Sequence, residues 1–494
     1  MSTRAYLGLD VGGTGAKAGV YDATGRRLGA GQVAYTPTVS PEGHVELPIE
    51  TVYAACRDAA RAAIAQAGVS VAALAIATQG QTFVSLDAED RPLHPAIVWY
   101  DSRAAREAAE LAQAVAAAGE RLPESDIAAI ATAPKILWLR RHHPAQMARA
   151  RRYLLLPDYL AYRLTGDAAT DPCTASSTGL YRDDDPDYSP TMLAAAQISR
   201  EELARIQPAG APIGRVRPAM AAEWGLSPEA LLVTGTNDQY AGALGAGNCR
   251  PGILSVTTGT CLALVTLTEQ LPDPLPEGLL GGRFPIPRYQ FALCYSKTAG
   301  VVLDWFRRVF CPERSLAELE ALAAQSPPGS NGVTMLHHFD GMVSPRPNAD
   351  ARGAFCGLSL SHGLGDLYRA ILESLAFSLR ENLALMRAAG LPVTVVRALG
   401  GGARSDLLLQ IDADVCGLPV ERPAVTEAAT LGAALLAAAG AGEYGSVEEA
   451  SERCYRPARV FTPNQPAAYE APFAAYRAAC RRLHEPEPPV PAPA

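Results

Sequence analysis

A carboxylate, a glycine-rich turn and a lysine lie close together near the start of the chain, at Asp10, Gly12–Gly15 and Lys17. Apolar residues on both sides predict two strands joined as a hairpin. The glycines predict a tight reversal with positive φ at positions 12, 13 and 15. Backbone N–H groups in such a turn can approach a phosphate, Thr14 and Lys17 add a hydroxyl and a charge, and Asp10 could orient a hydrated Mg²⁺. An ordinary glycine-rich hairpin with a buried aspartate explains this segment equally well.

Residues 254–265 repeat the same design of strand, small hydroxyl-bearing turn and strand. At one constant offset, Leu9, Val11 and Val20 match Leu254, Val256 and Val265. Ser255 stands in place of Asp10, so the two segments are alike in shape but not in charge. This internal duplication predicts two hairpins that hold a nucleoside triphosphate from opposite sides of a cleft. Only the first hairpin would supply a carboxylate for a metal.

Polar and aromatic side chains follow two further predicted strands. Gln79 and Gln81 come directly after an apolar segment, at the kind of strand end where open α/β sheets bind ligands. They could hydrogen-bond hydroxyl groups, or they could cap a hairpin. Trp99, Asp101 and Arg103 combine an aromatic face with charged hydrogen-bonding groups, a combination that suits sugars and polyols. In the alternative interpretation, Asp101 and Arg103 simply pair on the surface.

Asp238 follows a predicted strand at residues 230–234 and precedes a helix rich in small residues. A carboxylate at that junction could accept the proton of a substrate hydroxyl while the oxygen attacks the γ-phosphate of ATP. Aspartate is also a favoured N-cap residue, so helix capping is the competing interpretation. The small residues at 241–245 indicate that this helix packs closely against a neighbour.

A glycine triplet marks a possible base-binding site in the second half of the chain. Residues 393–399 predict a strand, and Gly400–Gly402 would leave an open floor for a flat purine or ribose. Ser405 is then expected to start a helix that ends at Gly417, with Pro419 beyond it.

Composition limits the classes of function. A chain of 494 residues is too long for one hydrophobic core, so two large domains are expected. Its 43 basic and 51 acidic residues give a net charge of −8. This charge does not indicate a basic surface for binding nucleic acid, and it would repel anionic lipid. The 10 cysteines are scattered without a C-x-x-C pair, as in a reducing compartment. With no signal peptide and no apolar run of ~18 residues, a cytoplasmic protein is expected.

Two other segments carry no predicted function. His337 and His338 are adjacent, but no third ligand is spaced to join them, so no metal site is predicted there. Residues 481–494, which become proline-rich at the end, are predicted to form a disordered tail.

Taken together, these motifs resemble the FGGY family of carbohydrate kinases, and most of all its xylulokinase branch. The two hairpins and the junction at Asp238 carry the resemblance, together with later segments at residues 296–306, 341–358 and 399–420. The glycine triplet alone is a weak signal, whereas several motifs in the family's order are a strong one. The resemblance extends from Tyr6 to about Gly445.

The resemblance implies an α/β fold of two actin/hexokinase/Hsp70-like (ribonuclease H-like) domains with a cleft between them. An N-terminal domain, 1–247, would bind mainly the sugar, and a C-terminal domain, 248–480, mainly the nucleotide. The cofactors would be ATP and Mg²⁺, the partner a small-molecule sugar, with no nucleic acid or membrane, and the chain could form a homodimer. Closure of the domains would expel water and limit phosphate transfer to it.

Individual roles follow from the same resemblance, with Asp238 as the general base. Substrate contacts are implied at Gln81, Thr82, Phe83, Trp99, Asp101, Asp238 and Gln239. Nucleotide contacts are implied at Asp10, Thr14, Lys17, Thr260, Gly300, Gly401, Gly402 and Ser405, with Asp10 holding Mg²⁺ through water.

The sequence departs from the xylulokinase pattern at the expected sugar site. The usual Gly-Gln-Met-His-Gly is Gly80–Val84 here, with Phe83 in place of histidine; Gly-Asp-Asn is Asn237–Gln239, and Gly-Glu-Arg is Gly341–Val343. Changed polar groups imply a changed preference. D-xylulose is the leading candidate, with ribulose, L-xylulose, erythritol and glycerol as alternatives. A regulatory ATPase of the same superfold is less favoured, because it would not need Asp238.

Overall fold

The computed structural model describes residues 4–119, 128–181 and 187–484, and the chain divides into two compact units. The first unit contains the chain up to Cys249 together with Gly282–Tyr289 and Glu427–Tyr455. The second unit contains Arg250–Gly281, Gln290–Thr426 and the chain from Arg456. The main change of unit therefore lies close to the expected boundary at residue 247, but Glu427–Tyr455 packs within the first unit although it was expected in the second domain.

The expected tail at residues 481–494 is only partly described. Residues 481–484 form the last turn of a helix, α16 (Glu470–His484), so they are ordered, contrary to the prediction. Residues 485–494 lie outside the described part of the chain.

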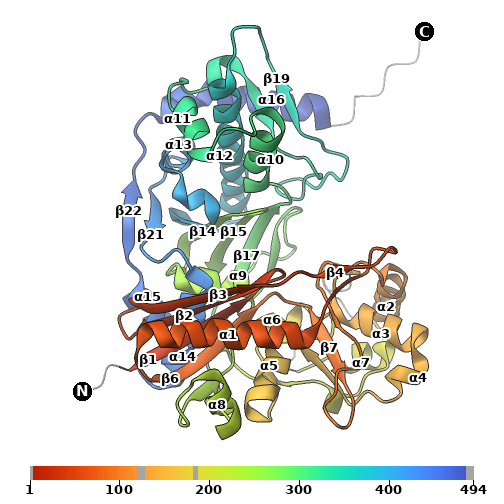
Figure 1. The fold of residues 1–494 in the computed structure, drawn as a ribbon. Helices are drawn as coiled ribbons and strands as arrows, with labels where there is room; N and C mark the ends of the chain where they lie inside the picture. The colour runs from red at the N-terminus through yellow and green to blue at the C-terminus, as the bar shows by residue number, and fades with distance from the viewer. Residues whose placement is uncertain (1–3, 120–127, 182–186, 485–494) are drawn as a thin grey trace, which may run out of the picture. The chain divides into compact units, whose positions relative to one another are not determined.

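The first unit is built on a six-stranded sheet of order β12-β13-β6-β1-β2-β3, of which β1, β2, β3 and β6 are labelled in Figure 1. Its strands are β1 (Ala5–Val11), β2 (Gly15–Asp22), β3 (Arg27–Ala34), β6 (Val71–Thr78), β12 (Pro212–Arg215) and β13 (Leu231–Val233). Strands β1, β6 and β13 are parallel, whereas β1, β2 and β3 form an antiparallel meander. The carboxyl ends of the three parallel strands therefore meet at one edge of the sheet.

The second unit repeats this pattern in a sheet of order β16-β17-β15-β14-β20-β21-β22. Its strands are β14 (Gly252–Thr258), β15 (Leu262–Thr268), β16 (Leu280–Arg283), β17 (Gln290–Ser296), β20 (Val393–Leu399), β21 (Val420–Pro423) and β22 (Pro457–Phe461). From β17 onward the pairings are antiparallel twice, parallel twice and then antiparallel, as they are from β3 in the first unit. The predicted internal duplication is confirmed.

The remaining elements include a five-stranded sheet of order β4-β5-β8-β7-β9 and two-stranded sheets formed by β10 with β11 and by β18 with β19. In the first unit they are β4 (Thr38–Val39), β5 (Val45–Leu47), α1 (Ile49–Ala67), β7 (Phe83–Leu86), β8 (Ala96–Ile97), α2 (Ala105–Ala117), α3 (Thr132–His142), α4 (Pro144–Met147), β9 (Arg152–Leu155), α5 (Leu156–Thr165), β10 (Ala169–Thr170), α6 (Pro172–Ser176), α7 (Pro190–Ala196), β11 (Arg205–Ile206), α8 (Pro218–Trp224), α9 (Asp238–Gly245), α14 (Ala428–Gly440) and α15 (Val447–Cys454). In the second unit they are α10 (Gly300–Phe310), α11 (Leu316–Ala323), β18 (Thr334–Leu336), β19 (Ala354–Cys356), α12 (Leu364–Ala388), η4 (Gly401–Arg404), α13 (Asp406–Cys416) and α16.

Helix α13 has the ends that the sequence predicts, and α1 ends at a glycine in the same way. Helix α1 is closed by Gly68 in the left-handed conformation, with φ of 62°. Helix α13 begins after Ser405, whose side chain accepts a hydrogen bond from the Leu408 N–H, and it is closed by Gly417 with φ of 64°. These ends follow from local residue types, because a hydroxyl satisfies an amide at the start of a helix and glycine tolerates the left-handed turn at its end.

The central strand of the first unit is covered on both faces. Leu7 and Leu9 point to one face and share a buried cluster with Val52 and Cys56 of α1. Gly8 points to the other face, where a Cβ atom would lie 1.8 Å from the Thr430 carbonyl oxygen of α14. The α14 backbone therefore lies directly on β1, at a distance that only glycine permits.

Helix α14 also contacts α9, the helix that begins at Asp238. A Cβ atom at Gly245 would lie 1.9 Å from the Ala428 carbonyl oxygen. A Cβ atom at Gly432 would lie 1.8 Å from the Ala241 carbonyl oxygen. The close packing predicted from the small residues of α9 is confirmed, and its neighbour is α14.

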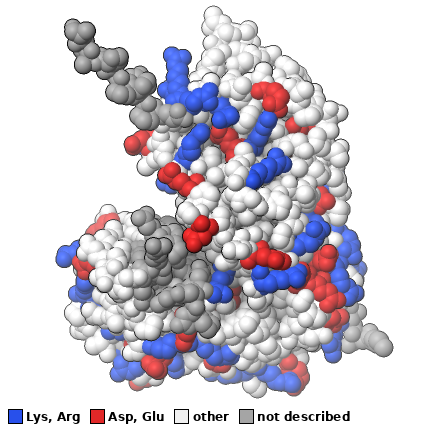
Figure 2. All heavy atoms as spheres, turned by 180° about the vertical axis from the view of Figure 1, so that it is seen from behind, with Lys and Arg blue, Asp and Glu red and all other residues white. Residues whose placement is uncertain are grey.

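Charges of both signs are interspersed on the face drawn in Figure 2, consistent with the modest net charge of −8. Within the described residues, no helix is both long and apolar enough to cross a bilayer.

We predict that Gly432→Ala lowers the free energy of unfolding by about 3 kcal/mol, because the new methyl group would push α14 away from α9. Chemical denaturation followed by circular dichroism measures the change. Gly242→Ala is the matched control, because it lies in α9 and a Cβ atom there would meet no neighbouring element within 4 Å, and it should change stability by less than about 1 kcal/mol. Equal effects of the two substitutions would contradict this account of the packing.

Candidate active site

Three chemically important segments meet at the carboxyl edge of the first unit's sheet. Asp10 is the second-last residue of β1, Gln79 follows β6, and Asp238 begins α9 just after β13. The pairing of β1 with β6 brings Asp10 opposite Ala77, and a parallel bridge joins Thr78 to Asn237. Asp10, Gln79 and Asp238, which the sequence indicated as candidate functional residues, therefore lie along the same edge of the sheet.

The first hairpin turn is held in place by Tyr35. The Tyr35 N–H donates to the Thr14 carbonyl oxygen at 3.0 Å, and the Tyr35 hydroxyl donates to the Gly12 carbonyl oxygen at 2.5 Å. The predicted positive φ at positions 12, 13 and 15 is wrong, since none of these glycines adopts it. Space is tight at Gly15 instead, because a Cβ atom there would lie 3.0 Å from the Val33 carbonyl oxygen.

Asp10 and Asp238 interact electrostatically. The pKa of Asp10 is raised to about 7, first by burial and then by the charge of Asp238. Lys17, which lies directly opposite Asp10 on β2, lowers this pKa, and Glu427 raises it. The pKa of Asp238 is raised to about 6 by burial, while the backbone N–H of Gln239 acts in the opposite direction. Both carboxyl groups therefore titrate close to neutrality.

Lys17 forms an ion pair with Glu427, the residue just before α14. The Lys17 Nζ atom lies 2.8 Å from a Glu427 carboxylate oxygen, and the two side chains are 38% and 39% exposed. A pair this exposed contributes only about 0–1 kcal/mol, so Lys17 can exchange Glu427 for another anion at little cost. A pocket beside the pair is lined also by Arg27, Gln32 and Thr430.

The donor set around Asp10 fits a hard divalent cation. Asp10 and Asp238 offer only oxygen atoms, and burial raises the pKa of both carboxyl groups, with the charge of Asp238 a second cause at Asp10. A bound cation would favour the ionised form of both. Mg²⁺ prefers carboxylate oxygens and retains several of its waters, so these residues suit a hydrated Mg²⁺.

The N-cap of α9 is Asn237, not Asp238. The Asn237 Oδ1 atom accepts a hydrogen bond from the Gln239 N–H at 2.9 Å. Asn237 therefore fills the capping role that was the competing interpretation for Asp238. The Gln239 side chain is exposed. Asp238 lies one position after Asn237, half-buried at the end of the sheet.

Trp99 is 39% exposed and packs edge-on against Tyr100, with ring centroids 5.3 Å apart. Its backbone is fixed from two sides. The Thr82 hydroxyl accepts a hydrogen bond from the Trp99 N–H at 3.0 Å. The buried Lys135 donates to the carbonyl oxygens of Trp99, Val98 and Ile130 at 2.7, 2.9 and 2.9 Å. Sequence reasoning missed Lys135; its only signal was a lone lysine within an apolar helix.

Both carboxylate oxygens of Asp101 accept hydrogen bonds within the protein. One oxygen accepts from the Arg103 backbone N–H and Nε at 3.0 and 2.9 Å. The other accepts from the Val45 N–H and from Arg103 Nη2, at 2.6 and 2.8 Å. The alternative pairing with Arg103 thus occurs, but in the interior rather than on the surface, since both side chains are almost fully buried.

Phe83 and Gln81 differ in their access to this edge. Phe83 is 1% exposed, and its ring packs edge-on against His94 inside a hydrophobic cluster. Gln81 is half-buried and adopts a left-handed backbone with φ of 60°, while its carbonyl oxygen accepts from the Thr132 hydroxyl at 3.0 Å. Such a conformation costs of order 1–3 kcal/mol in a non-glycine residue and is characteristic of ligand sites.

Gln79 is the residue whose polar groups most clearly need a ligand. It is 4% exposed, and neither atom of its amide has a hydrogen-bond partner among the described residues. The amide oxygen lies 3.3 Å from the position that a Cβ atom would take at Gly13, so it borders the glycine turn. An unsatisfied buried polar group costs about 1–3 kcal/mol, which a bound hydroxyl or phosphate would recover.

The second unit holds its own hairpin turn against α10. The Ala299 N–H donates to the Thr260 carbonyl oxygen at 2.8 Å, and the Gly300 N–H donates to the Gly259 carbonyl oxygen at 2.7 Å. A Cβ atom at Gly300 would lie 2.6 Å from that same Gly259 oxygen. The sequence-predicted residues Thr260 and Gly300 therefore lie together, with the Thr260 side chain exposed.

The glycine triplet follows β20 as predicted, but its members differ. A Cβ atom at Gly402 would lie 2.6 Å from the Thr258 Cβ atom, so this glycine allows close packing. Gly401 is open, because a Cβ atom there would have no neighbour closer than 3.6 Å. The Ser405 hydroxyl donates to Glu320 at 2.8 Å and accepts from the Leu408 N–H at 3.0 Å, which leaves it one acceptor site.

Proteins of known activity resemble this chain over most of its length. A xylulose kinase of Staphylococcus epidermidis is 29% identical over 410 residues, which are 83% of this chain and 82% of the relative. A glycerol kinase of Bordetella parapertussis is 33% identical over 482 residues, which are 93% of each chain. Autoinducer-2 kinases also match.

Solved structures and family models agree with these relatives. A xyloylose kinase from Brucella ovis superposes with a TM-score of 0.87 at 28% identity, covering 97% of this chain and 99% of its own. The N-terminal domain model of the FGGY carbohydrate kinases matches residues 5–245, and the C-terminal domain model matches residues 254–441. The predicted actin/hexokinase-like fold is confirmed, and the chain belongs to the FGGY family of carbohydrate kinases.

Proposed function

We propose that this sugar kinase transfers the γ-phosphate of ATP to a hydroxyl group of a ketopentose such as D-xylulose, with Asp238 as the general base. The observation that carries the proposal is the Asp238 carboxyl group, half-buried at the carboxyl edge of the sheet with a pKa of about 6. We expect the enzyme to act in the cytoplasm, where ATP is abundant.

Asp238 suits the role of base for two reasons. Its pKa lies below neutrality, so the carboxylate form predominates at pH 7 and can accept a proton. Burial nevertheless raises the pKa toward the working pH, which improves proton transfer in the transition state. The base would accept the hydroxyl proton at a carboxylate oxygen while the sugar oxygen attacks the phosphorus in line.

The phosphates of ATP are assigned to the glycine-rich turns and to the residues around them. Proposed contacts in the first unit are Thr14 and Lys17, with Asp10 orienting hydrated Mg²⁺. When bound, Mg²⁺ neutralises charge that develops on the phosphoryl oxygens. Lys17 would leave its weak pair with Glu427 to bind phosphate. Proposed nucleotide contacts in the second unit are Thr260, Gly300, Gly401, Gly402 and Ser405.

The sugar is assigned to the surface around Trp99. The exposed Trp99 ring offers an apolar face for the C–H side of a sugar. Gln81 and Gln239 are proposed to bond sugar hydroxyls, and the unsatisfied amide of Gln79 is a further candidate. Thr82, Phe83 and Asp101 are buried and are proposed to act through the backbone segments that they support.

Substrate choice within the family rests on two opposing considerations. The resemblance to xylulose kinases supports a ketopentose. The burial of Phe83 supports a changed preference, because the histidine usual at this position is replaced by a side chain without a polar group. Ribulose, L-xylulose, erythritol and glycerol are the alternatives, and glycerol is favoured by the 33% identity to a glycerol kinase.

The test is release of ADP from Mg·ATP with a panel of pentuloses, hexuloses and polyols and with a control that lacks sugar. Strong stimulation by D-xylulose is expected. Stimulation by glycerol or erythritol alone would replace the ketopentose by a polyol. ATP hydrolysis that no panel member increases would contradict the proposal and favour a regulatory ATPase.

We predict that Asp238→Asn lowers kcat by about 10²–10⁴-fold with little change in sugar affinity, because the amide keeps the shape of the side chain but cannot accept the proton. Steady-state kinetics and equilibrium sugar binding measure the two quantities. An active Asp238→Asn enzyme would exclude the base assignment.

The pH dependence provides an independent check on the same residue. Since the base must be ionised, kcat/KM of the wild type, measured at saturating Mg²⁺ to keep Asp10 ionised, should change little above pH 7 and fall about tenfold per pH unit below about pH 6. The residual activity of Asp238→Asn should lack this acidic limb.

We predict that Lys135→Met raises KM for the sugar by about tenfold or more while KM for ATP changes less than about twofold. The substitution removes three hydrogen bonds to backbone carbonyl groups, each worth about 0.5–1.5 kcal/mol, and so loosens the segment that carries Trp99. The exposed Arg106→Met is the control and should change neither constant. An unchanged sugar KM in a less stable Lys135→Met protein would reduce Lys135 to a purely structural role.

A further inference from the structure

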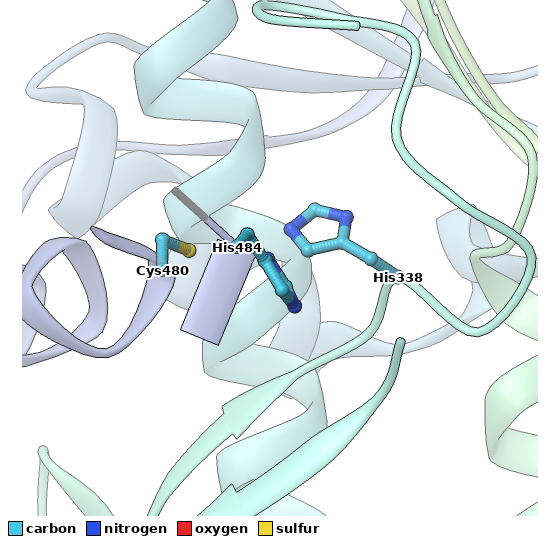
Figure 3. A group of neighbouring side chains, drawn as sticks. All are labelled: His338, Cys480 and His484. Carbon is cyan, nitrogen blue, oxygen red and sulfur yellow. The ribbon is translucent and has the colours of Figure 1, made fainter. Parts of the chain in front are cut away.

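Three potential metal ligands meet in the second unit, and none of them is assigned to the kinase reaction. His338 follows β18, while Cys480 and His484 lie one helical turn apart on α16 (Figure 3). One ligand atom from each residue lies within 4.8 Å of the other two. In Figure 3 the Cys480 sulfur points toward the His484 ring, and the His338 ring lies on the other side of that ring.

The hydrogen bonds of His484 leave its inner nitrogen available as a ligand. The Nε2 atom lies 3.0 Å from the Arg352 backbone carbonyl oxygen, and since a carbonyl oxygen can only accept, Nε2 carries the proton. In a neutral ring Nδ1 then presents a lone pair. The Nδ1 atom is buried and has no hydrogen-bond partner among the described residues.

His338 likewise has one ring nitrogen with a hydrogen-bond partner and one without. The residue is 1% exposed, and its Nε2 atom lies 3.3 Å from the Tyr476 hydroxyl. Its Nδ1 atom, like that of His484, has no partner within the part of the chain that the structure describes. Histidines that bind metals commonly use one nitrogen for the ion and the other for a hydrogen bond that fixes the ring. Tyr476 and the Arg352 carbonyl group occupy these supporting positions.

We propose that His338, Cys480 and His484 bind one Zn²⁺ ion, with water as the fourth ligand. The expectation from the sequence that His338 has no third ligand is wrong, because Cys480 and His484 reach it from a helix far along the chain. The other histidine of that pair, His337, is not included, since its Nδ1 atom already bonds the Ser374 hydroxyl at 2.8 Å.

The chemistry of the donors selects the ion. Two imidazole nitrogens and one sulfur favour Zn²⁺ over Mg²⁺, which prefers oxygen. Zinc bonds of ~2.0–2.3 Å require the three side chains to move slightly inward from their present spacing. Binding would release the thiol proton of Cys480, so affinity should increase with pH.

The site would fasten the last turn of α16 to the segment after β18. His484 is the final residue of α16, and its backbone carbonyl oxygen also accepts a hydrogen bond from Asn348 at 2.7 Å. A metal bond at this end would hold a helix terminus that otherwise depends on hydrogen bonds. We therefore assign the ion a structural role in the second unit.

The test uses the full-length protein, stripped of metal with a chelator and titrated with Zn²⁺ in a calorimeter. The wild type should bind one equivalent and melt at a higher temperature with Zn²⁺. Cys480→Ser and His484→Gln should each weaken binding by at least about 100-fold, because loss even of a residue supporting a metal ligand typically costs 10–100-fold. Cys356→Ser, which removes a thiol elsewhere in the same unit, is the matched control and should bind as the wild type does.

Cobalt provides a spectroscopic readout that does not depend on stability or activity. Co²⁺ in the same site should give a near-ultraviolet thiolate-to-cobalt charge-transfer band that is lost in Cys480→Ser and retained in Cys356→Ser. Circular dichroism and kinase activity without Zn²⁺ should be unchanged in all variants. Absence of stoichiometric Zn²⁺ binding, or equal binding by Cys480→Ser and the wild type, would overturn the proposal.

Discussion

The arrangement of the first unit depends on the direct contact of one helix backbone with two other backbones. Helix α14 touches β1 at Gly8 and α9 at Gly245 and Gly432, and in each case a single methyl group would overlap a carbonyl oxygen. The strand carries Asp10 and the helix begins at Asp238, so α14 fixes the two carboxyl groups relative to each other. Backbone contacts are well suited to holding two like-charged groups in place, because closely packed backbones move less than side chains do.

The same contacts explain the electrostatics of the site. Burial raises the pKa of both Asp10 and Asp238, and the nearby charge of Asp238 raises that of Asp10 further. Glu427 stands immediately before α14 and draws Lys17 toward it. The packing of α14 therefore helps to hold the carboxyl groups of Asp10, Asp238 and Glu427 near one another. A divalent cation and the Lys17 side chain would offset this negative charge.

Local patterns in the sequence predicted much of the fold but only part of the site. Both hairpins, their duplication and the ends of α1 and α13 follow from residues close together in the chain. The pairing of Lys17 with Glu427, the tether from Lys135 to Trp99 and the approach of His484 to His338 join residues far apart in sequence. No periodicity predicts such contacts. The glycines of the first turn show a further limit, because the sequence predicted positive φ there, whereas the structure has no positive φ and a tight backbone contact at Gly15.

The membership of Glu427–Tyr455 in the first unit has a consequence for how the protein is made. On a ribosome, residues up to Cys249 emerge first, but the helix that covers the Gly8 face of β1 is still missing. That face stays exposed while the second unit is synthesised, and the first unit closes only after α14 has emerged. The earlier half of the chain must therefore wait for the later half, an order opposite to the usual completion of N-terminal domains first.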